Sequence, residues 1–201
     1  TSADYLAFIY DRIKWSLGTT YYRMTSDFNL AGIDLNPIGT SVNPYQAQFD
    51  GQNHTLSNIT MTGTLQVGLF GNVGVSGLVS GVVVNGANIS GGDQVGGIAG
   101  YSVGKIYRAG VGGSSTISGL NGGYDNVGGI VGAQAKPGIV EECFVDSGVT
   151  VQSTGGGQLG GIAGSSTGTA NTAGNFSTIK NSYSRATVSG NVDRFGGMAG
   201  Y

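Results

Sequence analysis

The chain has 201 residues, of which 40 are glycine and three are proline, and nine basic against eleven acidic residues give it a net charge of −2. The glycines have no Gly-X-Y period, 39% of the residues are hydrophobic and no basic run is present, which excludes a collagen, a disordered linker and a nucleic-acid binder. No apolar run approaches the ~20 residues of a membrane span, and a single Cys and a single His exclude an internal disulfide and the common multi-His zinc sites.

Residues 1–18 are predicted to form an N-terminal cap helix. Ser2 is a suitable N-cap and Gly18 a suitable end, and four apolar residues between them fall at helical spacing: Leu6, Ile9, Ile13 and Leu17. Such a helix would cover the first coil of a β structure, whose edge is otherwise open to aggregation.

A glycine-rich phrase recurs through the rest of the chain. It reads VGLFG from Val67, VGGIAG from Val95, VGGIVG from Val127, LGGIAG from Leu159 and FGGMAG from Phe195, at intervals of 28, 32, 32 and 36 residues. Each phrase is followed by an apolar residue and, three positions later, a small one. These pairs are Leu78 and Gly81, Ile106 and Ala109, Val140 and Cys143, and Ile179 and Ser182. Short alternating stretches such as ANISG and VTVQS complete a pattern of three strands per repeat.

Repeats of this length cannot bury a core alone, but stacked copies can. The pattern therefore predicts an all-β fold, a right-handed parallel β-helix with about seven coils rising ~4.8 Å each. We expect one domain, with N-terminal coils over residues 19–66 and the repeats over 67–201. The interior should hold ladders of like residues: Val95, Val127, Leu159 and Phe195, with Ile98, Ile130, Ile162 and Met198 beside them. The phrase glycines fit places where adjacent coils approach closely or where φ is positive.

Few residues are candidates for chemistry. His54 has Asp50 four residues upstream within reach as a partner, but a satisfied turn histidine is the favoured interpretation. Cys143 falls in the small-residue column and is predicted to be buried rather than nucleophilic. Asp93, Asp125 and Asp193 each precede a glycine phrase by two residues and could bind Ca²⁺ or simply cap turns.

One turn lengthens along the stack, from YSVGK to AQAKPG to the uncharged segment Ser165–Ser177. Insertions on one edge of a solenoid often mark its binding face, and passive loop drift is the alternative. The residues chosen as a binding site are Asn171, Asn175 and Phe176, with Tyr101 on the neighbouring edge. The chain has ten tyrosines, Tyr45 among them. Those that are exposed could stack on sugars, although tyrosine is also a normal strand residue.

The glycine phrases and the stretch IKNSYSRATVSGN that follows one of them resemble the GLUG repeats of bacterial surface proteins. The segments YYRMTSDFNLAG, NPIG and FDGQNHTLSNITM resemble what commonly precedes such repeats. The resemblance covers nearly the whole chain. It implies a large secreted or cell-surface protein, such as an adhesin or an IgA1-specific metallopeptidase with its zinc motif in a separate domain.

The expected function is a non-catalytic module of a large bacterial protein, extracellular or on the cell surface, acting as adhesin or rigid scaffold. We expect no catalytic residue, no metal site and no cofactor apart from the possible calcium. Host or matrix glycans or proteins are the expected partners, with no nucleic acid and no membrane span, and the chain should be a monomeric segment of a longer array. The alternatives are the scaffold region of an IgA-type metallopeptidase and a carbohydrate-active β-helix enzyme.

Overall fold

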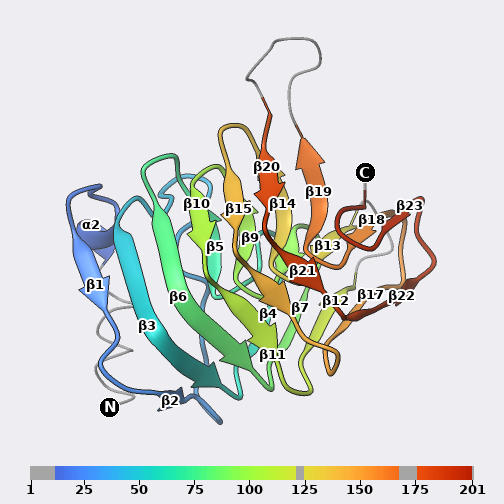
Figure 1. The fold of residues 1–201 in the computed structure, drawn as a ribbon, viewed down its shortest axis with the longest axis horizontal. Helices are drawn as coiled ribbons and strands as arrows, with labels where there is room; N and C mark the ends of the chain where they lie inside the picture. Colours follow the sequence, from blue (N-terminus) through green and yellow to red (C-terminus); the bar gives the residue numbers. More distant parts are fainter. Residues whose placement is uncertain (1–11, 121–124, 168–175, 201) are drawn as a thin grey trace.

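The computed structural model describes residues 12–120, 125–167 and 176–200, which form an all-β parallel solenoid of about five turns (Figure 1). Strands pair with strands one coil away, and the pairings are parallel. The predicted parallel β-helix class is therefore confirmed. Seven coils was too many, because residues 21–47 contribute only short strands and isolated bridges to the start of the stack.

The largest sheet, which we call the long sheet, has ten strands and lies at the front of Figure 1. Its strands are β1 (Tyr21–Arg23), β2 (Phe28–Asn29), β3 (Gln48–Ser57), β6 (Leu78–Asn85), β10 (Lys105–Tyr107), β11 (Gly110–Gly112), β15 (Ile139–Glu141), β16 (Phe144–Val145), β20 (Thr178–Lys180) and β21 (Tyr183–Ser184).

Three shorter sheets complete the wall of the solenoid. The second sheet holds β4 (Thr60–Gly63), β7 (Asn88–Gly91), β12 (Thr116–Gly119), β17 (Thr150–Ser153) and β22 (Thr187–Gly190). The third sheet holds β8 (Val95–Gly96), β13 (Asp125–Gly128), β18 (Gly157–Gly160) and β23 (Arg194–Gly196). The fourth sheet holds β5 (Phe70–Val73), β9 (Ala99–Ser102), β14 (Val131–Ala135) and β19 (Ala163–Thr167).

The glycine phrase forms a corner between the third and fourth sheets, so a coil has four sides where three strands per repeat were predicted. In one copy, β8 ends at Gly96 and β9 begins at Ala99. A Cβ on Gly97 would lie 2.6 Å from the carbonyl oxygen of Gly129 in the next coil, and one on Gly132 would overlap the backbone of Gln94. Neither glycine has a positive φ. Close approach of adjacent coils, rather than positive φ, is why these positions need glycine.

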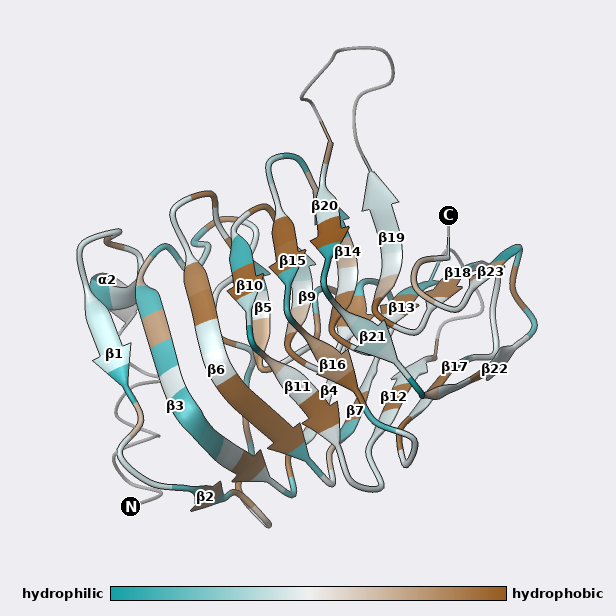
Figure 2. Cartoon of the chain, in the orientation of Figure 1, coloured by the Kyte–Doolittle hydropathy of each residue, from teal (hydrophilic) through white to brown (hydrophobic). Residues whose placement is uncertain are grey.

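The predicted ladders are present, and their members are buried except in the last coil, where Phe195 is 52% exposed and Met198 is 40% exposed. Val127 pairs with Val95 on one side and with Leu159 on the other, and Leu159 pairs with Phe195. The parallel ladder Ile98, Ile130, Ile162 and Met198 is joined by backbone hydrogen bonds of 2.9 Å from each amide to the carbonyl of the next member. Figure 2 shows the hydrophobic segments of the strands, which are most continuous along β6.

The second predicted column is shifted by one residue in its first copy. Ile106 pairs with Val140, as expected, but on its other side it pairs with Val79 rather than Leu78. Val79 is fully buried, whereas Leu78 points outward and pairs with Lys105. A slip of one residue exchanges the two faces of a strand, so the prediction had placed the wrong side chain in the core.

A single bend repeats along the long sheet. It lies inside the continuous strand β6 and separates the two strands of each later coil. Gly81, Arg108, Glu142 and Asn181 occupy this bend and all have left-handed φ, between 50° and 60°. Non-glycine residues rarely adopt this conformation. Its recurrence at one corner indicates that the flanking ladders fix the bend.

The start of the stack is filled by aromatic side chains. The short helix α2 (Arg12–Trp15) ends at Trp15, which is buried and lies 6.2 Å from the ring of Tyr45. Tyr45 in turn lies 4.8 Å from Phe70 and is fully buried, so it is not one of the exposed tyrosines expected from the sequence.

The predicted cap helix over residues 1–18 can be compared with the structure only from residue 12 onward. Ser2, Leu6 and Ile9 lie outside the described residues, and Leu17, expected on the buried face, is 53% exposed. The end of α2 is joined to the segment before β3 by backbone hydrogen bonds. The carbonyl of Trp15 accepts them from the amides of Gln46 and Ala47, at 2.9 and 3.1 Å.

Candidate functional site

The binding turn predicted from the sequence is described only at its flanks. Asn171 and Asn175 lie outside the described residues, while Phe176 is 58% exposed just before β20. Tyr101 is half-buried in β9, in register with Ala133, which is in register with Ser165. Tyr101 therefore lies two strands away from β19, the strand that enters the turn.

The bases of that turn are joined by hydroxyl contacts. Ser166 and Ser177 lie 2.9 Å apart between their hydroxyls, and Ser177 donates to the carbonyl of Thr167 at 3.1 Å. Gln134 in the previous coil donates to Ser166 at 2.9 Å. These contacts fix where the turn leaves the solenoid.

The aspartates considered for calcium do lie in one column, but with different surroundings. Asp125 is in register with Gly157 and buried, and it accepts a 2.9 Å hydrogen bond from Ser153. Asp93 accepts one of 3.1 Å from Asn126, and Asp193 is exposed. Across residues 12–120, 125–167 and 176–200, no three His, Cys, Asp or Glu side chains are grouped as metal ligands.

His54 does have a carboxylate partner, but it is Asp27 and not Asp50. The Nδ1 atom of His54 lies 3.0 Å from Asp27, which also accepts the amide of Thr55 at 2.8 Å. The amide and the imidazole hold the pKa of Asp27 below its ordinary value. The histidine therefore joins the strand β3 to the preceding segment, as expected of a structural residue.

Asp50 belongs to a separate contact on the outer face of β3. It accepts a hydrogen bond of 2.7 Å from the hydroxyl of Tyr21, and both the amide and the side chain of Gln52 also donate to it. Partial burial raises the pKa of Asp50, but these hydrogen bonds outweigh that effect and lower it overall. The same bond raises the pKa of Tyr21, since its proton is held between the two groups.

Cys143 is a buried core residue, as predicted. Its sulfur lies 3.3 Å from the carbonyl oxygen of Glu141 and 3.7 Å from that of Ile106. Burial raises the pKa of the thiol to about 11, which disfavours the thiolate needed for nucleophilic chemistry.

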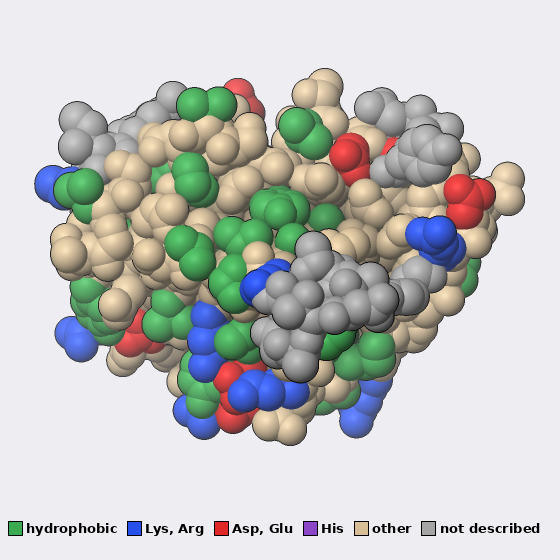
Figure 3. Space-filling model, turned by 90° about the horizontal axis from the view of Figure 1, so that it is seen from above, with side chains coloured by type: hydrophobic (Ala, Val, Ile, Leu, Met, Phe, Trp, Pro, Cys, Tyr) green, Lys and Arg blue, Asp and Glu red, His purple; other side chains and the backbone are tan. Residues whose placement is uncertain are grey.

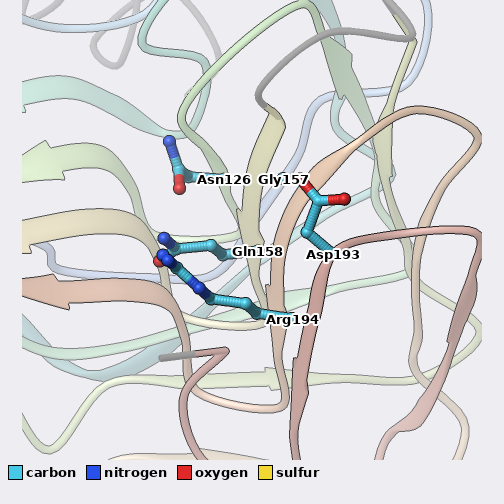
Figure 4. Close-up of a pocket in the computed structure, with 5 residues that line it drawn as sticks. All are labelled: Asn126, Gly157, Gln158, Asp193 and Arg194. Atoms are coloured by element: carbon cyan, nitrogen blue, oxygen red, sulfur yellow. The ribbon is translucent and has the colours of Figure 1, made fainter.

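A polar hollow of about 280 Å³ opens on the third sheet, where Gly157 interrupts the aspartate column. Its wall includes Asn126, Gln158 and Arg194, which are in register on three successive strands. Figure 4 shows the Gln158 and Arg194 side chains lying side by side, with Asp193 pointing to the other side of the hollow. The hollow presents amide, guanidinium and carboxylate groups, but no aromatic side chain among its described lining residues.

The outer face of the long sheet carries a charged and aromatic surface that the sequence did not single out. The carboxylate of Glu141 lies between two lysines, 2.7 Å from the Nζ atom of Lys105 and 2.9 Å from that of Lys180. The carboxylate of the adjacent Glu142 lies 2.7 Å from the Nε atom of Arg108. The two lysines hold the pKa of Glu141 below its ordinary value. Figure 3 shows basic and acidic side chains gathered, among hydrophobic ones, along the lower edge of that view.

Comparison with known proteins gives the fold a precedent. A crystal structure from Bacteroides ovatus, of a protein named provisionally as an immunoglobulin A1 protease, superposes with a TM-score of 0.63 over 94% of this chain and 67% of that one, at 20% identity. At this identity the likeness concerns the fold alone. The chain is a parallel β-solenoid.

At the sequence level the similarities are narrower. Halomucin of Haloquadratum walsbyi (strain DSM 16790 / HBSQ001) is 29% identical over an alignment 135 residues long, which covers 60% of this chain and 1% of halomucin. The solenoid thus corresponds to about a hundredth of that protein's length. No family model matches the chain, GLUG repeats included. No described helix has the length and apolar character to cross a membrane.

Proposed function

We propose that this chain is a non-catalytic extracellular module of a larger protein, a rigid solenoid that holds its outer face in a fixed register. The observation that carries the proposal is the unbroken interior ladder. Val95, Val127 and Leu159 are all fully buried and in register over three coils. A stack held by such ladders keeps the spacing of its coils constant, which suits a spacer or an adhesive surface.

The arrangement of carboxylates supports this role over that of a carbohydrate-active enzyme. A glycosidase needs one carboxyl with a raised pKa to protonate the leaving oxygen and a second carboxylate across the scissile bond. On the outer face of the long sheet, Glu141 is instead held as an anion by Lys105 and Lys180. The adjacent Glu142 is bound to Arg108.

The resemblance of the glycine phrases to GLUG repeats, together with the similarity to halomucin and to the Bacteroides ovatus structure, supports a surface or secreted location. Within an IgA-type peptidase the same solenoid would serve as scaffold, with the zinc chemistry in another domain. In a surface protein and in a peptidase alike, this chain would act as a rigid support.

The test is a pair of measurements on the purified chain. Hydrogen exchange should show slow exchange for the amides of Ile98, Ile130 and Ile162, because these amides bond across coils. Incubation with polysaccharides and with immunoglobulin A1 should release no product. Cleavage of either substrate, abolished by substitution of a carboxylate in this chain, would overturn the proposal.

A further inference from the structure

Three side chains on the outer face of the long sheet form a feature that we call the aromatic–arginine strip: Phe144, Tyr183 and Arg185. The strands alternate, so that Ile106 and Val145 are buried while their neighbours Tyr107 and Phe144 are partly exposed. Phe144 and Tyr183 are in register on β16 and β21. The strip is therefore presented to solvent by the ladder beneath it.

The rings of the strip are ordered by direct contacts. Phe144 and Tyr183 are stacked, with ring centroids 6.0 Å apart and an interplanar angle of 21°. The ring of Phe144 also covers Gly110, where any Cβ would overlap it. Tyr183 nevertheless stays 47% exposed. The strip thus offers a preformed aromatic surface whose side chains lose little freedom on binding.

The cation Arg185 lies beside these rings. The guanidinium of Arg185 lies 5.3 Å from the centre of the Tyr183 ring. Of the other cations of this face, Lys105 and Lys180 share an ion pair with Glu141, and Arg108 is paired with Glu142. Among the described ranges, Arg185 is in no ion pair, and its charge is available to a ligand.

We propose that the aromatic–arginine strip binds an anionic saccharide. The C–H face of a sugar ring would lie on Tyr183 and Phe144, which offer flat apolar surface. A carboxylate on the sugar would meet the guanidinium of Arg185, whose fork geometry suits such a group. This inference rests on the proposed non-catalytic role and adds to it a ligand class and a location, because the strip holds no general acid.

The polar hollow and the turn before β20 provide internal controls. The hollow carries Arg194, an exposed arginine on a different sheet that is not stacked on any ring of the strip. Phe176 is an exposed aromatic residue that precedes β20. Substitutions of these residues remove the same chemical groups without touching the strip.

The experiment measures binding of polygalacturonate oligosaccharides and of their methyl esters by calorimetry. Wild type should bind the free acid and not the ester. Arg185→Gln and Tyr183→Ala should each weaken binding about tenfold or more, the loss expected of one charge-assisted hydrogen bond or one stacked ring. Arg194→Gln and Phe176→Ala should bind like wild type, and thermal unfolding should show that all four variants are folded.

Three results would overturn the inference: no binding by wild type, equal affinity for the ester, or equal losses in Arg194→Gln or Phe176→Ala. Each of these leaves the rigid, non-catalytic module intact. Shortened oligosaccharides after incubation would instead contradict the proposed function.

Discussion

Ile130 and Met198 occupy the same ladder two coils apart, and yet Ile130 is fully buried while Met198 is 40% exposed. The difference lies in what covers each coil. Ile130 has a described coil on both sides, whereas the coil of Met198 has one on a single side. In a solenoid, burial is provided by the neighbouring repeats, so the same sequence position contributes differently along the stack.

The largest effect should come from removing a buried ladder side chain. Ile130→Ala is expected to lower the free energy of unfolding by about 2–5 kcal/mol, since it leaves a cavity between two coils. Met198→Ala, in the same ladder, should cost about 1 kcal/mol or less. Urea denaturation of both variants measures the difference, and equal losses would contradict the dependence of burial on neighbouring coils.

Moving the chain's single thiol to the equivalent position in the next coil, where it is less buried, should raise its reactivity toward a disulfide reagent by about two orders of magnitude. Cys143 is buried and its pKa is raised to about 11 from 9.0, which lowers the thiolate fraction at pH 8 about 100-fold. Ser182 follows it by one coil and is half-exposed. In Cys143→Ser/Ser182→Cys a disulfide reagent should react rapidly under native conditions. Similar rates for this variant and wild type would show that burial does not control the thiol.

A methyl group added at the corner tests the close approach of coils. Gly97→Ala should destabilise the protein by about 1–3 kcal/mol, because its Cβ would lie 2.6 Å from both the Gly129 carbonyl oxygen and a methyl of Val111. Gly197, at the same place in the last coil, has no atom within 4 Å of its added Cβ. Gly197→Ala should change the stability by less than about 0.5 kcal/mol. Thermal melts of the pair would refute the explanation if both variants lost the same stability.

The smallest effect concerns the ion pairs between coils. Hydrogen bonds from Lys105 and Lys180 lower the pKa of Glu141, so its contribution is present above the ordinary carboxyl pKa and lost as pH falls through the lowered one. The stability difference between wild type and Glu141→Gln should therefore shrink as pH falls from 7 to 3. Denaturation curves across this range measure it, with Lys105→Met as a second variant that should lose part of the same dependence, because Lys180 still pairs with Glu141. A difference that grows in acid would have the wrong sign for an ion pair of this kind.

The repeats made the ladders predictable from sequence. Val95, Val127 and Leu159 each open a copy of one phrase, so aligning the phrases also aligned the strands. The first copy failed because its long sheet strand reads LVSGVVVN, where Leu78 and Val79 are both apolar and the following Ser80 and Gly81 give no period from which to distinguish them.

The candidate surfaces depended on contacts that sequence spacing does not reveal. His54 meets Asp27, 27 residues away, because β2 and β3 lie side by side. Phe144 and Tyr183 stack across coils whose loops differ in length, so their neighbourhood appears only once the register is known. The predicted turn was singled out by its length and composition, and its flanking serines are the part that the structure describes.

Val79, Ile106, Val140 and Ile179 are consecutive rungs of one ladder, although 27, 34 and 39 residues separate them along the chain. The turns absorb the extra length while the hydrogen-bonded rungs keep their spacing. A foreign peptide or small domain inserted between β19 and β20 should therefore leave both flanking ladders in place. The protein then offers a display frame in which the choice of coil sets the height at which a guest is held.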